Sequence, residues 1–343
     1  MKTIVTFGEL MLRLKSPEHE RLFQSPRLEA TFGGGEANVA VSLAILGQRA
    51  RFVGALSRDA IGDAALRQLR GFGVDVSRVR RSAERTGIYF LETGADQRPS
   101  LVVYDRAHSA AAAMGPGDFD WKAILEDAHW FHVTGITPAL SRSAAEAAIE
   151  AATAAKAAGA RVSVDLNYRK KLWTYGVQAP EMMGRLAALA DVIIANEEDL
   201  QLGLGVAGRG TDPAAGKVGA EAYRDLCEKT RSRFPGLSAV AVTLRESRSA
   251  DRNGWSAVLL GQSGFLASSH YELTDIVDRV GGGDSFAAGL IFGLLEYGDE
   301  ARALEFAVAA SALKHTLPGD FNLATREEIE RLAGGDRSGR VSR

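Results

Sequence analysis

The sequence contains few of the residues that build disulfide frameworks and metal clusters. Its 343 residues include one cysteine, Cys227, which excludes an internal disulfide framework and any cysteine metal cluster. The six histidines show no metal-ligand spacing, and we expect His129 and His132, beside an expected strand, to be structural. A single packed thiol suits a reducing compartment, so the expected location is the cytoplasm.

Long apolar runs and an excess of basic charge are also missing. No apolar run reaches the length of a membrane span, and charged Glu9 and Arg13 interrupt any N-terminal signal-peptide core. The formal net charge of −2 argues against a general binder of nucleic acid or anionic membranes. Apolar residues make up 46% and charged residues 24%, which is ordinary for a chain that buries one large core. We therefore expect no nucleic-acid partner and no membrane partner.

Strand and helix patterns alternate along most of the chain, which indicates an α/β fold with a doubly wound, mostly parallel sheet flanked by helices. The expected strands of this sheet are Ile4–Phe7, Arg51–Ala55, Phe131–Thr134, Arg161–Leu166, Asp191–Ala195, Val240–Leu244 and Ala257–Leu260. The expected helices are Glu36–Leu46, Asp59–Phe72, a helix from the capping box Ser143–Glu146 to Gly159, one after Asp284, and Glu300–Leu313.

Two other segments, residues 10–32 and 82–107, do not fit this alternation. Short strand-like patterns in both predict that they form one small β-sheet, a lid over a cleft. The other expected parts are a main nucleotide- and substrate-binding domain of residues 1–9, 33–81 and 108–333, and a flexible tail of residues 334–343. Because an exposed face of the lid would need a partner, we also expect a homodimer or higher homo-oligomer through the lid.

The most informative stretch is residues 277–286, where three glycines and an aspartate precede an apolar helical pattern. Glycine lets the backbone turn tightly and approach a ligand closely. A helix that begins there presents unpaired N–H groups, which suit an anion such as phosphate. Since a carboxylate beside phosphate is repelled, Asp284 suits removal of a proton from a hydroxyl that attacks phosphorus. The alternative is that Asp284 and Ser285 cap the helix.

This stretch resembles Asp-x-x-Gly-x-Gly-Asp-x-Phe, the C-terminal signature of the ribokinase-like (PfkB) sugar kinases. The matching positions are Asp278, Gly281, Gly283, Asp284 and Phe286. The resemblance implies that Gly281 and Gly283, with Gly282 between them, form an anion hole for the transferred phosphoryl group. It also implies that Asp284 is the catalytic base. Many relatives bind a monovalent cation, so K⁺ near Asp278 is an open expectation.

A second stretch, Gly33–Ala40, resembles the N-terminal signature Gly-Gly-x-x-x-Asn-x-Ala of the same family. Glycines before a helix let a small ligand lie against the backbone, and a short amide such as Asn38 can bond a sugar hydroxyl. The resemblance implies substrate contacts at Gly34, Gly35 and Asn38. The alternative, a simple helix-start turn, loses weight because both signatures occur in the family's order.

Two further segments narrow the resemblance to the 2-keto-3-deoxygluconate kinases. Tyr104–Ala110 matches Tyr-x-Arg-x-x-Ser-Ala, and Asp165–Arg169 matches Asp-x-Asn-x-Arg. Arginine binds a carboxylate with a fixed fork of donors, so a sugar acid is a sensible ligand. For either arginine alone, a surface ion pair is the alternative. The substrate contacts expected here are Arg106, Arg169, Tyr89 and Tyr104.

The remaining expected contacts are those to ATP and Mg²⁺. Asn196–Asp199 follows a strand and resembles the family's Asn-x-x-Glu, whose acid holds magnesium through water; here either Glu198 or Asp199 could take that role. A solvated helix N-terminus is the alternative. Arg245 replaces a glycine that is common where the family's nucleotide loop begins. The nucleotide contacts that the resemblance implies are Asn196, Thr243, Arg245, Ala312 and Gly281–Gly283.

These resemblances together imply ATP-dependent phosphorylation of 2-keto-3-deoxygluconate to its 6-phosphate. The nearest alternatives are other sugar kinases of the family, namely a fructokinase, a ribokinase or a 5-dehydro-2-deoxygluconokinase. A different kind of alternative is a non-catalytic sugar- or nucleotide-binding regulator on the same fold. The intact Asp284, Gly281 and Gly283 argue against that regulator.

Overall fold

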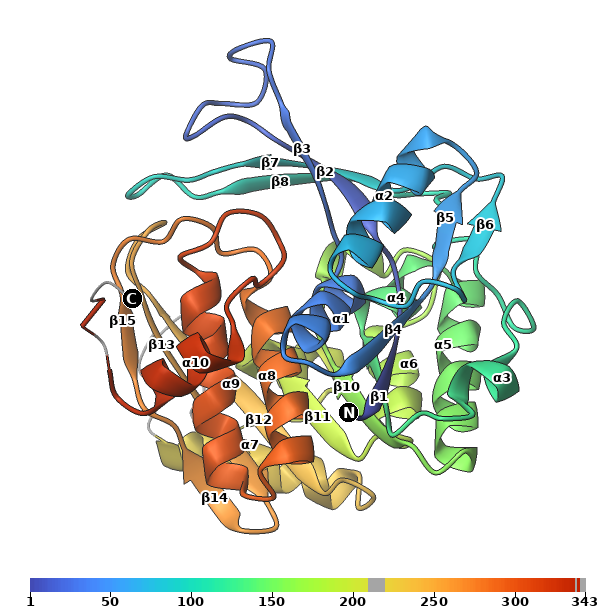
Figure 1. Cartoon of the computed structure of the whole chain (residues 1–343). Coiled ribbons are helices and arrows are strands. Elements are labelled where there is room, and N and C mark those ends of the chain that lie inside the picture. The colour runs from blue at the N-terminus through green and yellow to red at the C-terminus, as the bar shows by residue number, and fades with distance from the viewer. Residues whose placement is uncertain (209–219, 337, 340–343) are drawn as a thin grey trace.

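The computed structural model describes residues 1–208, 220–336 and 338–339, and its largest element is a nine-stranded sheet (Figure 1). The strand order is β14-β13-β12-β11-β10-β9-β1-β4, and β15 pairs with β13. Pairs from β12 to β4 are parallel, whereas β13, β14 and β15 add antiparallel strands at one edge. The bounds are β1 Thr3–Phe7, β4 Arg49–Val53, β9 Trp130–Thr134, β10 Arg161–Asp165, β11 Val192–Ala195, β12 Ala239–Ser247, β13 Asn253–Gly261, β14 Gly264–Ala267 and β15 Tyr271–Leu273.

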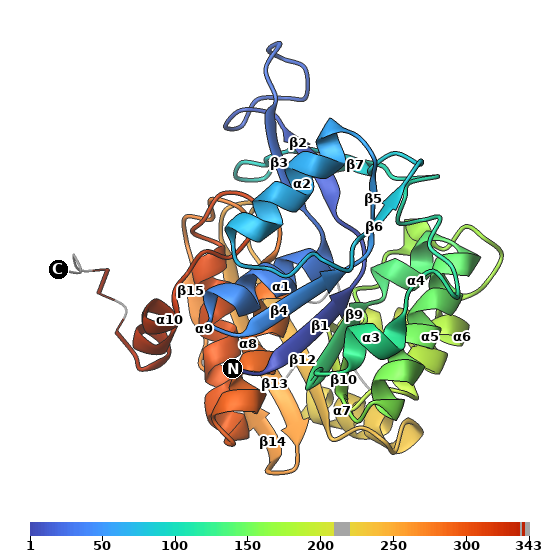
Figure 2. The same cartoon turned by 45° about the vertical axis from the view of Figure 1, so that its right-hand side comes forward.

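Helices cover both faces of this sheet (Figure 2). One face carries α1 Gly35–Ile45, α2 Ala60–Gly71, α8 Gly282–Glu296, α9 Glu300–Lys314 and α10 Arg326–Ala333. The other carries α3 Trp121–Leu125, α5 Arg142–Ala157, α6 Ala179–Ala187 and α7 Ala220–Arg233, with the short α4 Ile136–Leu140 against α5. The expected doubly wound, mostly parallel α/β architecture is therefore confirmed.

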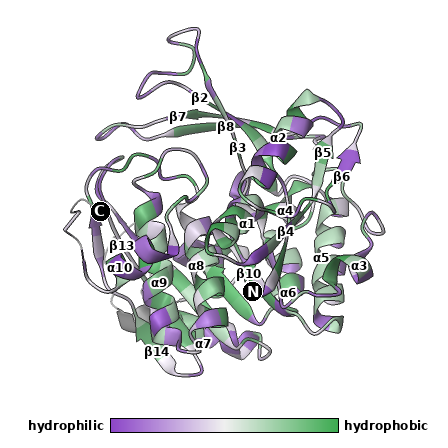
Figure 3. Cartoon of the chain, viewed as in Figure 1, coloured by the Kyte–Doolittle hydropathy of each residue, from purple (hydrophilic) through white to green (hydrophobic). Residues whose placement is uncertain are grey.

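Burial explains why the central strands are apolar throughout. Every residue of β1 and of β9 is buried, because helices pack on both faces of the parallel sheet. Figure 3 shows hydrophobic colouring in the strands at the centre of the molecule, around β10, and on helices beside them. Within the part of the chain that the structure describes, no helix is long and apolar enough to cross a membrane.

A separate four-stranded sheet has the order β3-β2-β7-β8, and we refer to it as the small sheet. Its strands β2 and β7 pair in parallel, and its other two pairs are antiparallel. Figures 1 and 2 show it at one end of the molecule, apart from the main sheet. The expectation that these two segments form one sheet is confirmed. The bounds are β2 Met11–Lys15, β3 Glu29–Gly33, β7 Ile88–Glu92 and β8 Leu101–Asp105.

Two local expectations are wrong. The predicted strand Arg51–Ala55 is two strands, because β4 ends at Val53 and β5 (Ala55–Ser57) pairs instead with β6 (Arg80–Ser82). Gly54 makes the change of direction possible, since a Cβ there would lie 2.3 Å from the carbonyl oxygen of Gly8. The capping box at Ser143 is also wrong: α5 starts earlier, and Ser141 Oγ accepts the cap bond from Ala144 N at 3.1 Å.

Two further expectations concern short segments. The sequence after β11, Asn196–Leu200, predicts the start of a helix, and the structure has a π-helical turn there, Asp199–Gly203. A short 3₁₀ turn, Lys170–Leu172, lies between β10 and α6. The expected tail, residues 334–343, lies partly outside the described residues, and its flexibility stays a prediction.

The connectivity locates the place where a ligand is most easily held. Strand β1 has β4 on one side and β9 on the other, so the chain reverses its direction of travel across the sheet at β1. In open α/β sheets, ligands bind outside the carboxyl ends of the strands at such a switch point. The segments that follow β1, β9, β10 and β11 therefore meet beside the N-termini of α1 and α8.

Candidate active site

The glycine turn leads directly into α8. Gly281 is the N-cap residue, and its φ of 84° lies in the left-handed region that favours glycine. Gly283 N and Asp284 N lie in the first helical turn, where no carbonyl of the same helix can accept them. A Cβ on Gly283 would meet nothing within 4 Å, so open space lies beside these donors. The turn therefore presents the donors and the room that an anion needs.

Asp284 is buried in that first turn and does not cap the helix, because α8 begins two residues earlier at Gly282. Asn38 Nδ2 donates to Asp284 Oδ2 across 2.6 Å. Burial raises the pKa of Asp284 to about 6, although the Asn38 hydrogen bond opposes the rise. The carboxylate is thus ionised at neutral pH and is a stronger base than an exposed aspartate. The alternative interpretation as a helix cap is wrong.

The N-terminal signature lies against the same carboxylate. A Cβ on Gly35 would lie 3.6 Å from Asp284 Oδ1, so Oδ1, the oxygen that Asn38 does not bond, faces this glycine. Asn38 Oδ1 also accepts from Gly34 N at 3.2 Å, which fixes the amide. Gly34 must be glycine, since a Cβ would lie 2.0 Å from the carbonyl oxygen of Glu9. The two sequence signatures therefore lie side by side, with Gly35 and Asn38 of the first against Asp284 of the second.

Two further buried carboxylates belong to this region: Asp165, the last residue of β10, lies near Asp284, and Asp199, in the turn after β11, lies near Asp165. Burial raises the pKa of Asp165 well above its usual range, and the charges of Asp199 and Asp284 add to the rise. Burial also raises the pKa of Asp199 to about 6. The sequence reasoning missed Asp165 as a site residue, although it begins the segment that contains Arg169. Each of the three buried acids therefore has a pKa above the ordinary value for an aspartate.

The proposed magnesium segment is fixed by its own hydrogen bonds. Asp199 Oδ2 accepts from Asn196 N at 2.9 Å, while Asn196 Oδ1 accepts from Asp199 N at 2.9 Å. Asp199 Oδ1 accepts from Tyr168 N at 2.8 Å, which ties this turn to the segment after β10. Glu198 is exposed. Asp199 thus shapes the turn, and Glu198 is the acid that remains free to face solvent.

Three arginines lie near one another in this region: Arg169 is close to the acids, Arg279 belongs to the segment that leads into the glycine turn, and Arg245 is close to both. The pKa of Arg245 is lowered by burial and by the nearby charges of Arg279 and Arg169. The charge of Arg169 opposes the raised pKa values of Asp165, Asp199 and Asp284, so it too lies close to them. Among the described residues, none of the three arginines forms an ion pair with a carboxylate. Their charge is available to an anionic ligand.

Arg106 differs from these three arginines because it is already paired with a carboxylate. Its guanidinium forms a buried ion pair with Glu9, and Nε donates to Glu9 Oε2 at 2.9 Å. Ser109 Oγ also donates to Glu9, at 3.0 Å. Tyr104 stacks near Arg106, with the guanidinium carbon 5.1 Å from the ring centre, and is 48% exposed. The predicted contact of Arg106 with a sugar acid stays a prediction, but its charge is already balanced.

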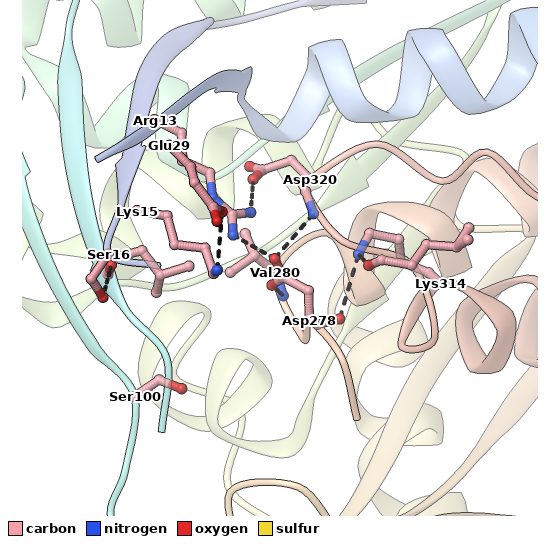
Figure 4. Close-up of polar contacts among 12 residues, drawn as sticks. Arg13, Lys15, Ser16, Glu29, Ser100, Asp278, Val280, Lys314 and Asp320 are labelled. Atoms are coloured by element: carbon pink, nitrogen blue, oxygen red, sulfur yellow. Dashed lines mark hydrogen bonds and ion pairs between the residues drawn. The ribbon is translucent and has the colours of Figure 1, made fainter. Parts of the chain in front are cut away.

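A buried ionic network joins the small sheet to the glycine turn (Figure 4). Arg13, from β2, forms ion pairs with Asp278 and with Asp320, the latter at 2.6 Å. Tyr89, from β7, donates its hydroxyl to Asp320 at 2.6 Å. The predicted sugar contact Tyr89 therefore already has a protein partner. The sequence reasoning missed Arg13 and Asp320, since no local pattern reveals partners this far apart along the chain.

Two other expected nucleotide contacts, Thr243 and Ala312, lie on β12 and α9. Thr243 Oγ1 donates to the carbonyl oxygen of Ala195 at 3.4 Å. Ala312 is buried in the core around α9, so its expected contact with the nucleotide stays a prediction. His315 lies against the glycine turn, because a Cβ on Gly282 would meet its ring at 2.8 Å.

Comparison with known proteins agrees with this geometry. The model of the pfkB family carbohydrate kinases matches residues 1–325. A 2-dehydro-3-deoxygalactonokinase of Haloferax volcanii is 34% identical over 97% of each chain, and a 2-dehydro-3-deoxygluconokinase of Bacillus subtilis is 30% identical over 97% of this chain and 96% of its own. The crystal structure of a Thermotoga maritima 2-dehydro-3-deoxygluconokinase has 47% identity and a TM-score of 0.92, covering 98% of this chain and 100% of that one. The chain belongs to the PfkB family of carbohydrate kinases.

Proposed function

We propose that this kinase transfers the γ-phosphoryl group of ATP to 2-keto-3-deoxygluconate and forms the 6-phosphate. The observation that carries the reaction is Asp284, a buried carboxylate beside free helix N–H groups and open space. The observation that supports an acidic substrate is Arg169, which forms no ion pair with a carboxylate among the described residues. Similar proteins bear the name 2-dehydro-3-deoxygluconokinase, a synonym for the same activity.

In this mechanism Asp284 accepts the proton of the substrate's 6-hydroxyl as the oxygen attacks the γ-phosphorus. The bond from that phosphorus to the bridging oxygen breaks, and ADP leaves with the electron pair. The N–H groups of Gly283 and Asp284 stabilise the charge that develops on the moving phosphoryl oxygens. Asn38 holds the carboxylate in place, so that Oδ1 is the oxygen that receives the proton.

The acidic turn after β11 suits a magnesium ion held through water. Magnesium keeps several waters and takes one or two carboxylates. Glu198, which is exposed, would hold it, and Asp199 orients the turn through its hydrogen bonds with Asn196, which would lie beside the nucleotide. When bound, Mg²⁺ neutralises charge on the β- and γ-phosphates. We assign Arg245 and Arg279 to the nucleotide phosphates.

We assign the substrate carboxylate to Arg169. It is exposed, it lies close to Asp284, and among the described residues its Nη1 donates only to the carbonyl oxygen of Tyr168, at 2.9 Å. Arg106, which Glu9 already neutralises, contributes less. The exposed ring of Tyr104 provides a wall for the sugar chain, and the glycines at positions 34 and 35 let it approach the backbone.

The small sheet is proposed as the lid, made of residues 10–32 and 82–107, over a main domain of residues 1–9, 33–81 and 108–333. Within the described ranges, the last strand of the small sheet, β8, has one edge that pairs with no other strand, and it exposes Leu101, Val103 and Tyr104 by 45–48%. An exposed apolar edge strand needs a partner. We therefore propose a homodimer in which the lids of two copies meet, located in the cytoplasm where ATP is made.

A phosphate-transfer screen over sugar acids and neutral sugars tests this function. A charge-assisted hydrogen bond contributes roughly 1.5–3 kcal/mol, so we expect kcat/KM for 2-keto-3-deoxygluconate to exceed that for fructose or ribose by about a hundredfold or more. Arg169→Ala should lower kcat/KM for the acid by a similar factor and leave the neutral sugars nearly unchanged. Arg106→Ala is the matched variant, and it should lower kcat/KM for the acid by a smaller factor.

Equal rates for fructose or ribose and for the acid would leave only the general sugar-kinase function. Preference for the galactonate-derived epimer would move the assignment toward the Haloferax relative's named activity. Preference for 5-dehydro-2-deoxygluconate would support another member of the family. No ATP consumption with any sugar or sugar acid would favour a non-catalytic regulator.

A further inference from the structure

Lys314, the last residue of α9, has its ammonium group completely buried. Its Nζ donates to two main-chain carbonyl oxygens, that of Leu317 at 3.0 Å and that of Asp278 at 3.4 Å (Figure 4). Among the described residues, no carboxylate oxygen lies within 4.0 Å of this ammonium. A buried ammonium is costly unless it is paired and bonded, so this arrangement calls for a reason.

The ammonium lies directly behind the glycine turn. Asp278 begins the segment that runs to Gly281, and its side chain shapes it by accepting from Val280 N at 3.1 Å. A Cβ on Gly281 would lie 3.3 Å from Lys314 Cε, so the lysine packs against the residue where the backbone turns. Lys314 therefore supports the turn at Gly281, whereas the space beside Gly283 stays open.

The charges around Lys314 indicate why a cation is buried here. Arg13 pairs with both Asp278 and Asp320, and all three side chains are buried. With Lys314, two cations balance two carboxylates. The carboxylate of Asp278 is satisfied by Arg13, and its carbonyl oxygen by Lys314. Main-chain carbonyl oxygens are also the ligands that proteins offer to K⁺. The residues at Asp278 thus do not fit an added monovalent cation. Its carboxylate oxygen is already paired with the guanidinium of Arg13, and its carbonyl oxygen with the ammonium of Lys314.

We propose that Lys314 is a tethered monovalent cation, which positions the turn from Asp278 to Gly283 for phosphoryl transfer and makes the kinase independent of free K⁺. The lysine is a positioning residue, since it acts through the carbonyl oxygen of Asp278 and not on the substrate. This inference rests on the proposed kinase function for its catalytic readout. It replaces the expectation of K⁺ near Asp278.

The wild-type protein supplies the first measurement. Turnover of 2-keto-3-deoxygluconate is measured in tetramethylammonium chloride, free of K⁺, Na⁺ and NH₄⁺, and in KCl at equal ionic strength. Equal values of kcat and of KM for ATP are the expected result. A wild-type enzyme that requires K⁺ for turnover overturns the proposal, whatever its variants do.

Lys314→Ala and Lys314→Met supply the second measurement. The alanine variant leaves two carbonyl oxygens unpaired and a cavity that a small cation can enter. Misplacement of the turn by about 1 Å would lower kcat on the order of a hundredfold. We expect K⁺, NH₄⁺ or methylamine to restore part of that loss, and tetramethylammonium, which is too large, to restore none. Lys314→Met fills the cavity without charge, so it should lose activity and resist rescue by every cation.

A melting experiment separates this proposal from the proposed function. We expect KCl and NH₄Cl to raise the Tm of Lys314→Ala more than tetramethylammonium chloride does, with no such difference in the wild type or in Lys314→Met. This readout needs no turnover, so it stands even if no sugar acid is phosphorylated. If Lys314→Ala does not fold, the wild-type measurement and Lys314→Met still decide. Wild-type turnover in Lys314→Met would overturn the proposal.

Discussion

Strands β9 and β8 have the same length and a similar apolar character, yet opposite surroundings. The sequence of β9 is WFHVT and every residue is buried, whereas the sequence of β8 is LVVYD and every residue is exposed. β9 lies between β1 and β10 under helices on both faces, while β8 is the last strand of the small sheet. Position in the fold, and not composition, decides which apolar strand is covered.

The same contrast separates the two sides of the proposed active site. The side built on the main domain holds Asn38 and Asp284 buried and hydrogen-bonded, so its geometry is fixed before any ligand arrives. The side built on the small sheet leaves Tyr104 half exposed. Preorganised groups suit charge stabilisation in the transition state. We infer that the main domain performs the chemistry and that the small sheet selects and encloses the substrate.

The strongest test of the fixed side is Asp284→Asn, which keeps the shape and the partner of the side chain but removes the base. Loss of a general base lowers kcat by about two to four orders of magnitude. KM for ATP and the melting temperature should change little, because asparagine fits the same volume. Single-turnover and steady-state kinetics measure the loss. An unchanged kcat would show that Asp284 takes no proton and would end the assignment of base catalysis.

The two sides also differ in how well the sequence predicted them. The turn from Gly281 to Asp284 and the helix start at Gly34 were predicted because each is a local pattern, and the structure brings them together as expected. Arg13 and Asp320 were missed, since nothing near either residue in the sequence indicates their ion pair. The neutralisation of Arg106 by Glu9 was missed for the same reason. Local turns and periodicity follow from short stretches, whereas partners in a buried charge network follow only from the fold.

The pH dependence of kcat/KM tests the side of the site that holds Asp284, with a smaller expected change in rate. The pKa of Asp284 is raised to about 6, so below that pH the base becomes protonated and kcat/KM should fall about tenfold per pH unit. Asp320 raises this pKa further, whereas Asn38, Arg169 and Lys314 lower it. Asn38→Ala removes a hydrogen bond to the ionised form, so the acid limb should move to higher pH. A limb that stays in place would mean that another group titrates there.

A substitution in the small sheet should change kcat least and should change the oligomeric state clearly. Val103 is 45% exposed in the middle of β8, where the proposed homodimer would bury it. Val103→Glu places a charge in that contact, so the sedimentation mass should fall from dimer to monomer. The fixed side is untouched, and a surface substitution usually changes stability by no more than about 0.5 kcal/mol, so kcat should stay within about threefold.

Ile61→Glu is the matched control, because Ile61 is 39% exposed on α2 and lies outside the small sheet. It adds the same charge to the same kind of apolar surface, and it should leave the mass of the dimer unchanged. If both variants dissociate the dimer, added charge and not the edge of β8 is responsible. If the wild-type protein already sediments as a monomer, the exposed strand has another partner or none. The contrast between β8 and β9 would then concern the substrate cleft alone, with the apolar residues of β8 covered only when the small sheet closes over a bound sugar acid.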